Sequence, residues 1–197
     1  MNDTPEDSYV SRGGLKLAAA LDAFGLDPAG FVCADLGCNV GGFTDCLLQR
    51  GAARVYAVDT GYGQLAWTLR NDERVSVMER TNAMHVDVPV GAVDLVVLDM
   101  GWTPQRHAIP AALRWKPAHI VSLIKPHYEA SEQTRGRGKL DEDQAAEVCK
   151  QTLDQADQWG VTVVDHIRSP VIGGAGKGKR GNTEYLALMQ PLDTSRG

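Results

Sequence analysis

Several features that would assign a protein quickly are missing from this sequence of 197 residues. No apolar run approaches the roughly 20 residues that a transmembrane helix needs, so we expect no membrane-spanning segment. Residues 1–7 are acidic and lack the basic and apolar parts of a signal peptide. We therefore expect a cytoplasmic protein with flexible tails at residues 1–8 and 192–197.

Cysteine is scarce and poorly spaced for metal binding. Cys33, Cys38, Cys46 and Cys149 show no CxxC spacing, and the sequence offers no paired histidines at ligand distance. Buried thiols in a reducing compartment are the better interpretation, and we expect no metal site.

An excess of positive charge is also missing. The formal net charge is −5, which argues against a protein that coats nucleic acid without selectivity. A local basic face on an acidic protein remains compatible with this value.

Apolar segments with strand character alternate with segments of helical spacing along most of the chain. This alternation predicts an α/β domain over residues 9–191, with a mostly parallel sheet and helices on both faces. The last two strands are joined by a glycine-rich loop without a helix, so they should form an antiparallel pair at one edge. Expected strands are 31–35, 54–59, 75–78, 95–99, 119–124, 161–167 and 185–189, and expected helices are 15–24, 44–50, 64–70, 109–115 and 141–159.

A glycine-rich turn follows the first expected strand. Asp35 ends that strand, and Gly37, Gly41 and Gly42 precede the next helix. Glycines let the backbone turn tightly and approach a ligand closely. Because the spacing is not GxGxxG, a dinucleotide site is a poor match.

Polar residues also stand at the ends of the next two strands. Asp59 is placed to bond ribose hydroxyls, and Asn82 is placed to bond an adenine edge. The glycine-rich turn, Asp59 and Asn82 thus follow three successive strands, and together they favour a cofactor of the adenosine type without a 2′-phosphate. The predicted cofactor-binding set is Asp35, Gly37, Cys38, Gly41, Gly42, Phe43, Asp59, Asn82 and Asp99.

Four short stretches resemble one known family. Residues 9–17 (YVSRGGLKL), 41–49 (GGFTDCLLQ), 61–67 (GYGQLAW) and 79–83 (ERTNA) are similar to the TlyA (hemolysin A) branch of the FtsJ-like RNA methyltransferases. The resemblance covers about residues 9–190, and its first and third stretches are the most specific. It implies S-adenosylmethionine as cofactor, a Rossmann-like seven-stranded sheet with one antiparallel strand, and methylation of a ribose 2′-hydroxyl in RNA, with ribosomal RNA or a ribosomal subunit as the expected partner.

The resemblance also implies a catalytic tetrad, which falls on Lys16, Asp99, Lys125 and Glu184. A ribose hydroxyl is a poor nucleophile until its proton is held or removed. Lys125 could accept that proton or orient the oxygen lone pair, while the two carboxylates position the ammonium groups. The donor methyl group is already activated, so in-line alignment supplies much of the remaining catalysis.

The chain departs from the family pattern in three places. It begins at the methyltransferase, whereas members of this branch usually begin with a small RNA-binding domain. Residues 100–104 (MGWTP) and 38–40 also differ from the usual residues. Both loops should line the site, so the choice of acceptor is open.

Cations near the tetrad segments predict where RNA would bind. Trp102 and Tyr128 are candidates for stacking on a base. The predicted RNA-binding cations are Arg12, Arg135, Arg137, Lys139, Arg168, Lys177, Lys179 and Arg180.

Two other functions remain open from the sequence. A methyltransferase of the same fold acting on a small molecule would explain the acidic charge. A non-enzymatic RNA-binding or hemolysin-like protein is the second alternative, although no segment is basic and amphipathic enough to suggest membrane insertion. The sequence leaves the oligomeric state undetermined.

Overall fold

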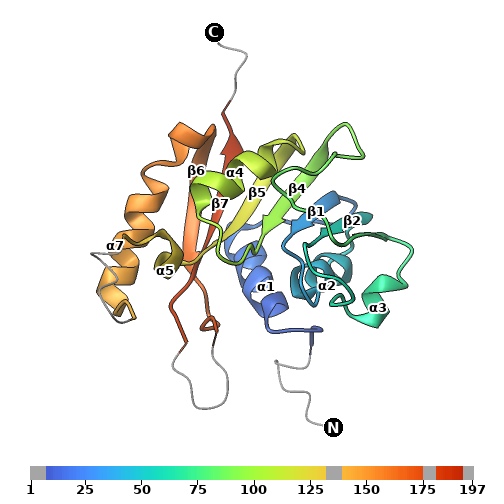
Figure 1. Ribbon diagram of the computed structural model, residues 1–197, viewed down its shortest axis with the longest axis horizontal. Helices are drawn as coiled ribbons and strands as arrows, with labels where there is room; N and C mark the ends of the chain where they lie inside the picture. The colour runs from blue at the N-terminus through green and yellow to red at the C-terminus, as the bar shows by residue number, and fades with distance from the viewer. Residues whose placement is uncertain (1–7, 132–138, 175–180, 193–197) are drawn as a thin grey trace.

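A computed structural model describes residues 8–131, 139–174 and 181–192, and its centre is one seven-stranded sheet (Figure 1). Figure 1 shows α7 at the β6 edge of this sheet and α3 toward the opposite edge. The strands are β1 (Val32–Leu36), β2 (Arg54–Val58), β3 (Val75–Met78), β4 (Val93–Leu98), β5 (Pro117–Ile124), β6 (Val161–Arg168) and β7 (Tyr185–Pro191). The helices are α1 (Gly13–Phe24), α2 (Gly42–Gln49), α3 (Trp67–Arg70), α4 (Gln105–Leu113), α5 (Pro126–Glu129), α7 (Glu142–Leu153) and the 3₁₀ helix η2 (Ala156–Trp159).

The strand order is β3-β2-β1-β4-β5-β7-β6. The first five strands of the chain pair in parallel, and β7 lies antiparallel between β5 and β6. The predicted mostly parallel sheet with one antiparallel strand is thus confirmed. The strand order reverses between β1 and β4, and ligands of open α/β sheets bind beyond the carboxyl ends of strands at such a point.

Alternate residues of the central strands face opposite layers of helix. On one face Cys33, Val55 and Leu95 pack with side chains of α1 and α2. On the other face Ala34 and Val96 pack with α4, α7 and η2. Strands buried on both sides read as continuous apolar runs, which is the pattern of the sequence.

The expected helix over residues 141–159 is wrong as a single helix. Asp141 caps the first turn of α7 in a capping box with Gln144, but α7 ends at Leu153. The chain tightens into η2, so that Ala156 can join the core under α4, and Gly160 then turns into β6 with a φ of 87°. Helical spacing continued across this break because η2 presents its apolar residues to the same core.

α1 and α2 begin two residues before the expected starts, and α3 and α4 differ by three and four residues. α3 begins at Trp67 instead of residue 64, since the preceding turn lines a cavity described below. α4 covers Gln105–Leu113 instead of 109–115, because the backbone N–H of Gln105 donates to Glu129 Oε1 at 2.8 Å and fixes an earlier start.

Candidate active site

Three adjoining cavities lie at the carboxyl ends of β1, β2, β4 and β5. Their volumes are about 200, 610 and 300 Å³, and we call them the α1, nucleoside and tetrad cavities. Gly37, Asn39 and Asp99 line all three, so the loops after β1 and β4 form their common wall. The cavities therefore occupy the switch point of the sheet.

The nucleoside cavity contains both polar residues predicted at successive strand ends, Asp59 and Asn82. Asp59 Oδ1 accepts the Gly61 N–H at 2.7 Å, and its Oδ2 accepts the Asn39 N–H at 2.9 Å. Each carboxylate oxygen keeps a second acceptor position, which suits a ribose diol. Asn82 Oδ1 accepts the Met84 N–H at 2.9 Å, which fixes the orientation of the amide.

Glycine is required at the common wall. Gly37 has a φ of 88°, and a Cβ there would lie 2.7 Å from the carbonyl oxygen of Asp99. A Cβ on Gly42 would lie 2.3 Å from Ser11 Oγ, where α2 approaches the start of α1. Gly37 and Gly42, both predicted to bind the cofactor, therefore line the α1 cavity with their backbone.

Gly41 has a different environment. Its φ is 104°, and a Cβ would lie 2.4 Å from Leu69 Cδ1, so the close neighbour is α3. Gly41 is absent from the linings of the three cavities, whereas the predicted cofactor residues Cys38 and Phe43 line the α1 cavity. The geometry therefore gives Gly41 a packing requirement, and its contact with a cofactor stays a prediction.

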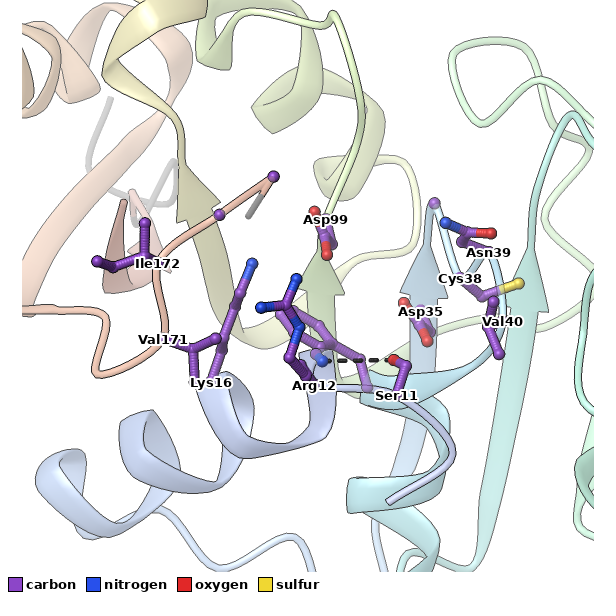
Figure 2. Close-up of a pocket in the computed structure, with 16 residues that line it drawn as sticks. Ser11, Arg12, Lys16, Asp35, Cys38, Asn39, Val40, Asp99, Val171 and Ile172 are labelled. Carbon is purple, nitrogen blue, oxygen red and sulfur yellow. Dashed lines mark hydrogen bonds between the residues drawn. The ribbon is translucent and has the colours of Figure 1, made fainter. Parts of the chain in front are cut away.

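Asp35 is a fully buried acid in the wall of the α1 cavity (Figure 2). Its Oδ2 accepts the Thr44 N–H at 2.9 Å and the Thr44 hydroxyl at 2.7 Å. Its Oδ1 has no hydrogen-bond partner among the described residues. Burial raises the pKa of Asp35 to about 7, and the negative charge of Asp99 adds to the effect while the Thr44 bonds oppose it.

The tetrad cavity is lined by all four residues of the predicted tetrad. The ammonium of Lys16 donates to Glu184 Oε2 at 2.6 Å, and both side chains are buried. Lys125 Nζ lies 2.5 Å from Asp99 Oδ1 and also donates to the Met100 carbonyl at 3.3 Å. The four residues therefore form two ion pairs around one cavity.

Strand register explains how residues so distant in sequence meet. β7 runs antiparallel to β5 with Tyr185 opposite Ile124, so Glu184 and Lys125 extend from the same edge. β4 ends one residue before Asp99 and lies on the other side of β5. Lys16 reaches this edge from the second turn of α1.

Gly173 brings a second segment against the tetrad. It pairs with Asn182 in an isolated antiparallel bridge, at the base of the loop between β6 and β7. A Cβ on Gly173 would lie 1.9 Å from Glu184 Oε1. The carboxylate is therefore held between this backbone and Lys16.

The predicted RNA-binding cations do not form one cluster in the described residues. Arg12 lines the α1 cavity and points into it beside Lys16 (Figure 2). Arg168 pairs with Glu142 at 2.6 Å on the surface, and Lys139 is exposed before α7. Five predictions lie outside the described residues, namely Arg135, Arg137, Lys177, Lys179 and Arg180.

Other cavity-lining residues were missed by sequence reasoning. Asn39 lines all three cavities. Its φ is 49°, a conformation that Asn tolerates better than most residues. An Asn between the glycines of this turn was therefore the sequence signal that could have indicated its position. Gln64 lines the nucleoside cavity and His127 the tetrad cavity, with no periodicity to indicate either. By contrast, Trp102 and Tyr128 were predicted as candidates for stacking on a base, and they line the nucleoside and tetrad cavities respectively. Trp102 is 85% exposed, and its ring lies 5.0 Å from that of Tyr128.

The strand order, the antiparallel seventh strand and the site at the switch point define a Rossmann-like methyltransferase fold, of the class that uses S-adenosylmethionine. A family model described as "FtsJ-like methyltransferase" matches residues 9–190. The chain belongs to this family, and the expectation of a methyltransferase is confirmed.

Named relatives agree with this assignment. The chain is 42% identical over 191 residues to "16S/23S rRNA (cytidine-2'-O)-methyltransferase TlyA" of Mycobacterium tuberculosis, covering 94% of this chain and 69% of that protein. It is 34% identical to "Hemolysin A" of Brachyspira hyodysenteriae, covering 91% and 75%. The solved structure "Putative hemolysin from Streptococcus thermophilus" superposes with a TM-score of 0.87 at 34% identity, covering 98% of this chain and 70% of that one.

Proposed function

We propose that this chain transfers a methyl group from S-adenosylmethionine to a ribose 2′-hydroxyl of ribosomal RNA. The observation that carries the proposal is the tetrad cavity, which is lined by two lysine–carboxylate pairs and shares a wall, including Asp99, with the nucleoside cavity. A donor site and an acceptor site that share Gly37, Asn39 and Asp99 suit direct transfer between two substrates.

The residues present fit the cofactor. Asp59 and Asn82 would hold the ribose and the adenine in the nucleoside cavity. In the α1 cavity, Asp35 Oδ1 is an acceptor without a partner in the described chain, and would accept from the α-ammonium group of the methionine part. Arg12 lines the same cavity and would bind the α-carboxylate. When bound, this cofactor supplies an electrophilic methyl group on a sulfonium.

The tetrad would prepare the acceptor. After releasing one proton to solvent, Lys125 would hold the ribose hydroxyl as a neutral amine and accept its proton as the oxygen–carbon bond forms, the carbon–sulfur bond breaks and S-adenosylhomocysteine leaves. Asp99 orients Lys125 through the 2.5 Å pair, and the Met100 carbonyl restrains the ammonium from a second direction. Lys16 and Glu184 would position the ribose from the opposite wall.

The ribosomal substrate is supported by the relatives. The M. tuberculosis protein is named as a methyltransferase of 16S and 23S rRNA, and tetrad and cofactor residues of this chain lie within the matched family segment. A ribosomal substrate would place the protein in the cytoplasm. In the described part of the chain, no helix is long and apolar enough to cross a membrane, and no group of three His, Cys, Asp or Glu side chains is arranged to hold a metal ion.

The test is methyl transfer from radiolabelled S-adenosylmethionine to purified 16S and 23S rRNA and to ribosomal subunits, followed by mapping of the label. We expect label on a ribose 2′-oxygen, insensitive to a chelator and falling steeply with salt. Label that enters only small metabolites of a cell extract, with none in RNA, would favour the small-molecule alternative and refute the proposal.

A further inference from the structure

Large apolar side chains that are exposed in the described residues concentrate around the cavities. Val40 and Ile172 line the α1 cavity, and Trp102 lines the nucleoside cavity. Tyr62 follows a cavity residue, Gly61, and is 69% exposed. The full set is Val40, Tyr62, Trp67, Trp102, Val164, Ile172 and Leu192. Only two of the seven, Val164 on β6 and Leu192 after β7, lie away from the cavity-lining segments.

Trp67 belongs to the same neighbourhood. It begins α3 and is 75% exposed. The preceding residue, Ala66, donates its backbone N–H to the Val40 carbonyl at 3.0 Å, so the start of α3 is fixed to the loop after β1. The indole is therefore held on the surface beside the cofactor loop and is not on a free segment.

Arg80 is a cation in contact with one of these aromatics, Tyr62. Its guanidinium lies 4.1 Å from the centroid of the Tyr62 ring. The backbone N–H of Arg80 donates to the Gly61 carbonyl at 3.0 Å, which keeps the two segments together. In the described residues no carboxylate forms an ion pair with Arg80, whereas the nearby Arg70 pairs with Glu79. Arg80 is thus the cation of this region that can still meet a phosphate.

We propose that Tyr62, Trp67 and Arg80, which we call the aromatic patch, bind single-stranded RNA next to the target nucleotide. Exposed aromatic rings and an arginine are what unpaired bases and phosphates require, because bases stack on rings and the cation binds the backbone. Tyr62 directly follows Gly61, which lines the nucleoside cavity. An RNA strand whose target nucleotide enters the tetrad cavity would therefore extend past the cofactor toward the aromatic patch. This inference rests on the proposed function and adds a contact surface outside the catalytic cavities.

The experiment compares Tyr62→Ala, Trp67→Ala and Arg80→Ala with the wild-type protein, using purified 16S and 23S rRNA as the probe. We expect each aromatic substitution to raise the KM for RNA about 10-fold, as loss of one stacked base does, with kcat within twofold. Arg80→Ala should raise the KM and reduce the slope of binding against log salt by about 1. Tyr62→Phe should keep the wild-type KM, since it preserves the ring.

Val164→Ala is the matched control, because it removes an exposed apolar side chain from the edge strand β6. Its KM should stay within twofold, and the affinity of all variants for S-adenosylhomocysteine should be unchanged by calorimetry. If the wild type methylates rRNA and the three patch variants keep a normal KM, the patch is not an RNA surface while the proposed function stands. Loss of S-adenosylhomocysteine affinity equal to the rise in KM would also overturn the inference, by assigning the patch to the cofactor site. If no rRNA is methylated by the wild type, both proposals are wrong.

Discussion

Replacement of Lys125 tests the tetrad most directly, because its ammonium is held by two acceptors. Asp99 Oδ1 lies at 2.5 Å and the Met100 carbonyl at 3.3 Å, and the side chain is only 13% exposed. Lys125→Ala removes the group that would hold or accept the hydroxyl proton. We expect turnover to fall by about 100-fold or more, the scale of a lost general base, which corresponds to about 2.7 kcal/mol of transition-state stabilisation. Lys125→Arg should also be poor, because a guanidinium stays protonated.

The same variant should leave cofactor binding nearly unchanged. Lys125 lines the tetrad cavity but is absent from the linings of the nucleoside and α1 cavities. Single-turnover methyl transfer and calorimetry with S-adenosylhomocysteine separate the two effects. Lys150→Ala is a matched control, since it removes a lysine from an exposed ion pair with Asp154, where little loss is expected. Turnover within tenfold of wild type for both Lys125 variants, on an RNA that the wild type methylates, would refute the assigned role.

Three other substitutions follow from the geometry. Asp59→Ala should weaken S-adenosylhomocysteine binding by roughly 1.5–3 kcal/mol in calorimetry, through lost charge-assisted bonds to the ribose, and an unchanged Kd would contradict the assignment. Gly173→Ala should cut turnover about tenfold or more, because its Cβ would lie 1.9 Å from Glu184 Oε1 and displace a carboxylate whose complete loss would cost about 100-fold or more. Gly91→Ala, where a Cβ meets nothing within 4 Å, is the control. Asp35 has a folded-state pKa raised to about 7, above its unfolded value, so its contribution to stability is complete below about pH 4 and is lost as the pH rises through 7. Asp35→Asn should therefore flatten the fall in stability between pH 4 and 8 in urea titrations, and an unaltered pH profile would show that Asp35 titrates normally.

Much of the architecture was predictable because the central strands β1, β4 and β5 are largely buried on both faces. Apolar runs such as 95–99 and 119–124 predict such strands with little ambiguity. The glycine-rich loop before residue 185, which contains no helix, predicted that β7 is antiparallel to its neighbours. The extent of α7 was not predictable. Whether a helix continues past Leu153 depends on how η2 meets α4, and that contact is not encoded in local spacing.

The site was predicted unevenly for a related reason. Lys16, Asp99, Lys125 and Glu184 came from a resemblance, and the sheet register then brought them to one cavity. The sequence could not predict which lysine pairs with which carboxylate, or at what distance. It also could not predict the close approach of Gly173 to Glu184. The packing of Gly41 against Leu69 was also hidden, since a glycine that approaches a ligand and a glycine that approaches a helix look alike in sequence.

The pair between Lys16 and Glu184 joins residues 168 positions apart, at opposite ends of the folded chain. During synthesis the helix that carries Lys16 leaves the ribosome long before the strand that follows Glu184 exists. The antiparallel strand β7 must then insert between β5 and β6 before the second carboxylate of the cavity is present. Long-range pairings of this kind form late because the chain loses the entropy of a long loop before the contact stabilises it. A nascent or truncated chain that stops short of β7 would therefore lack a complete tetrad.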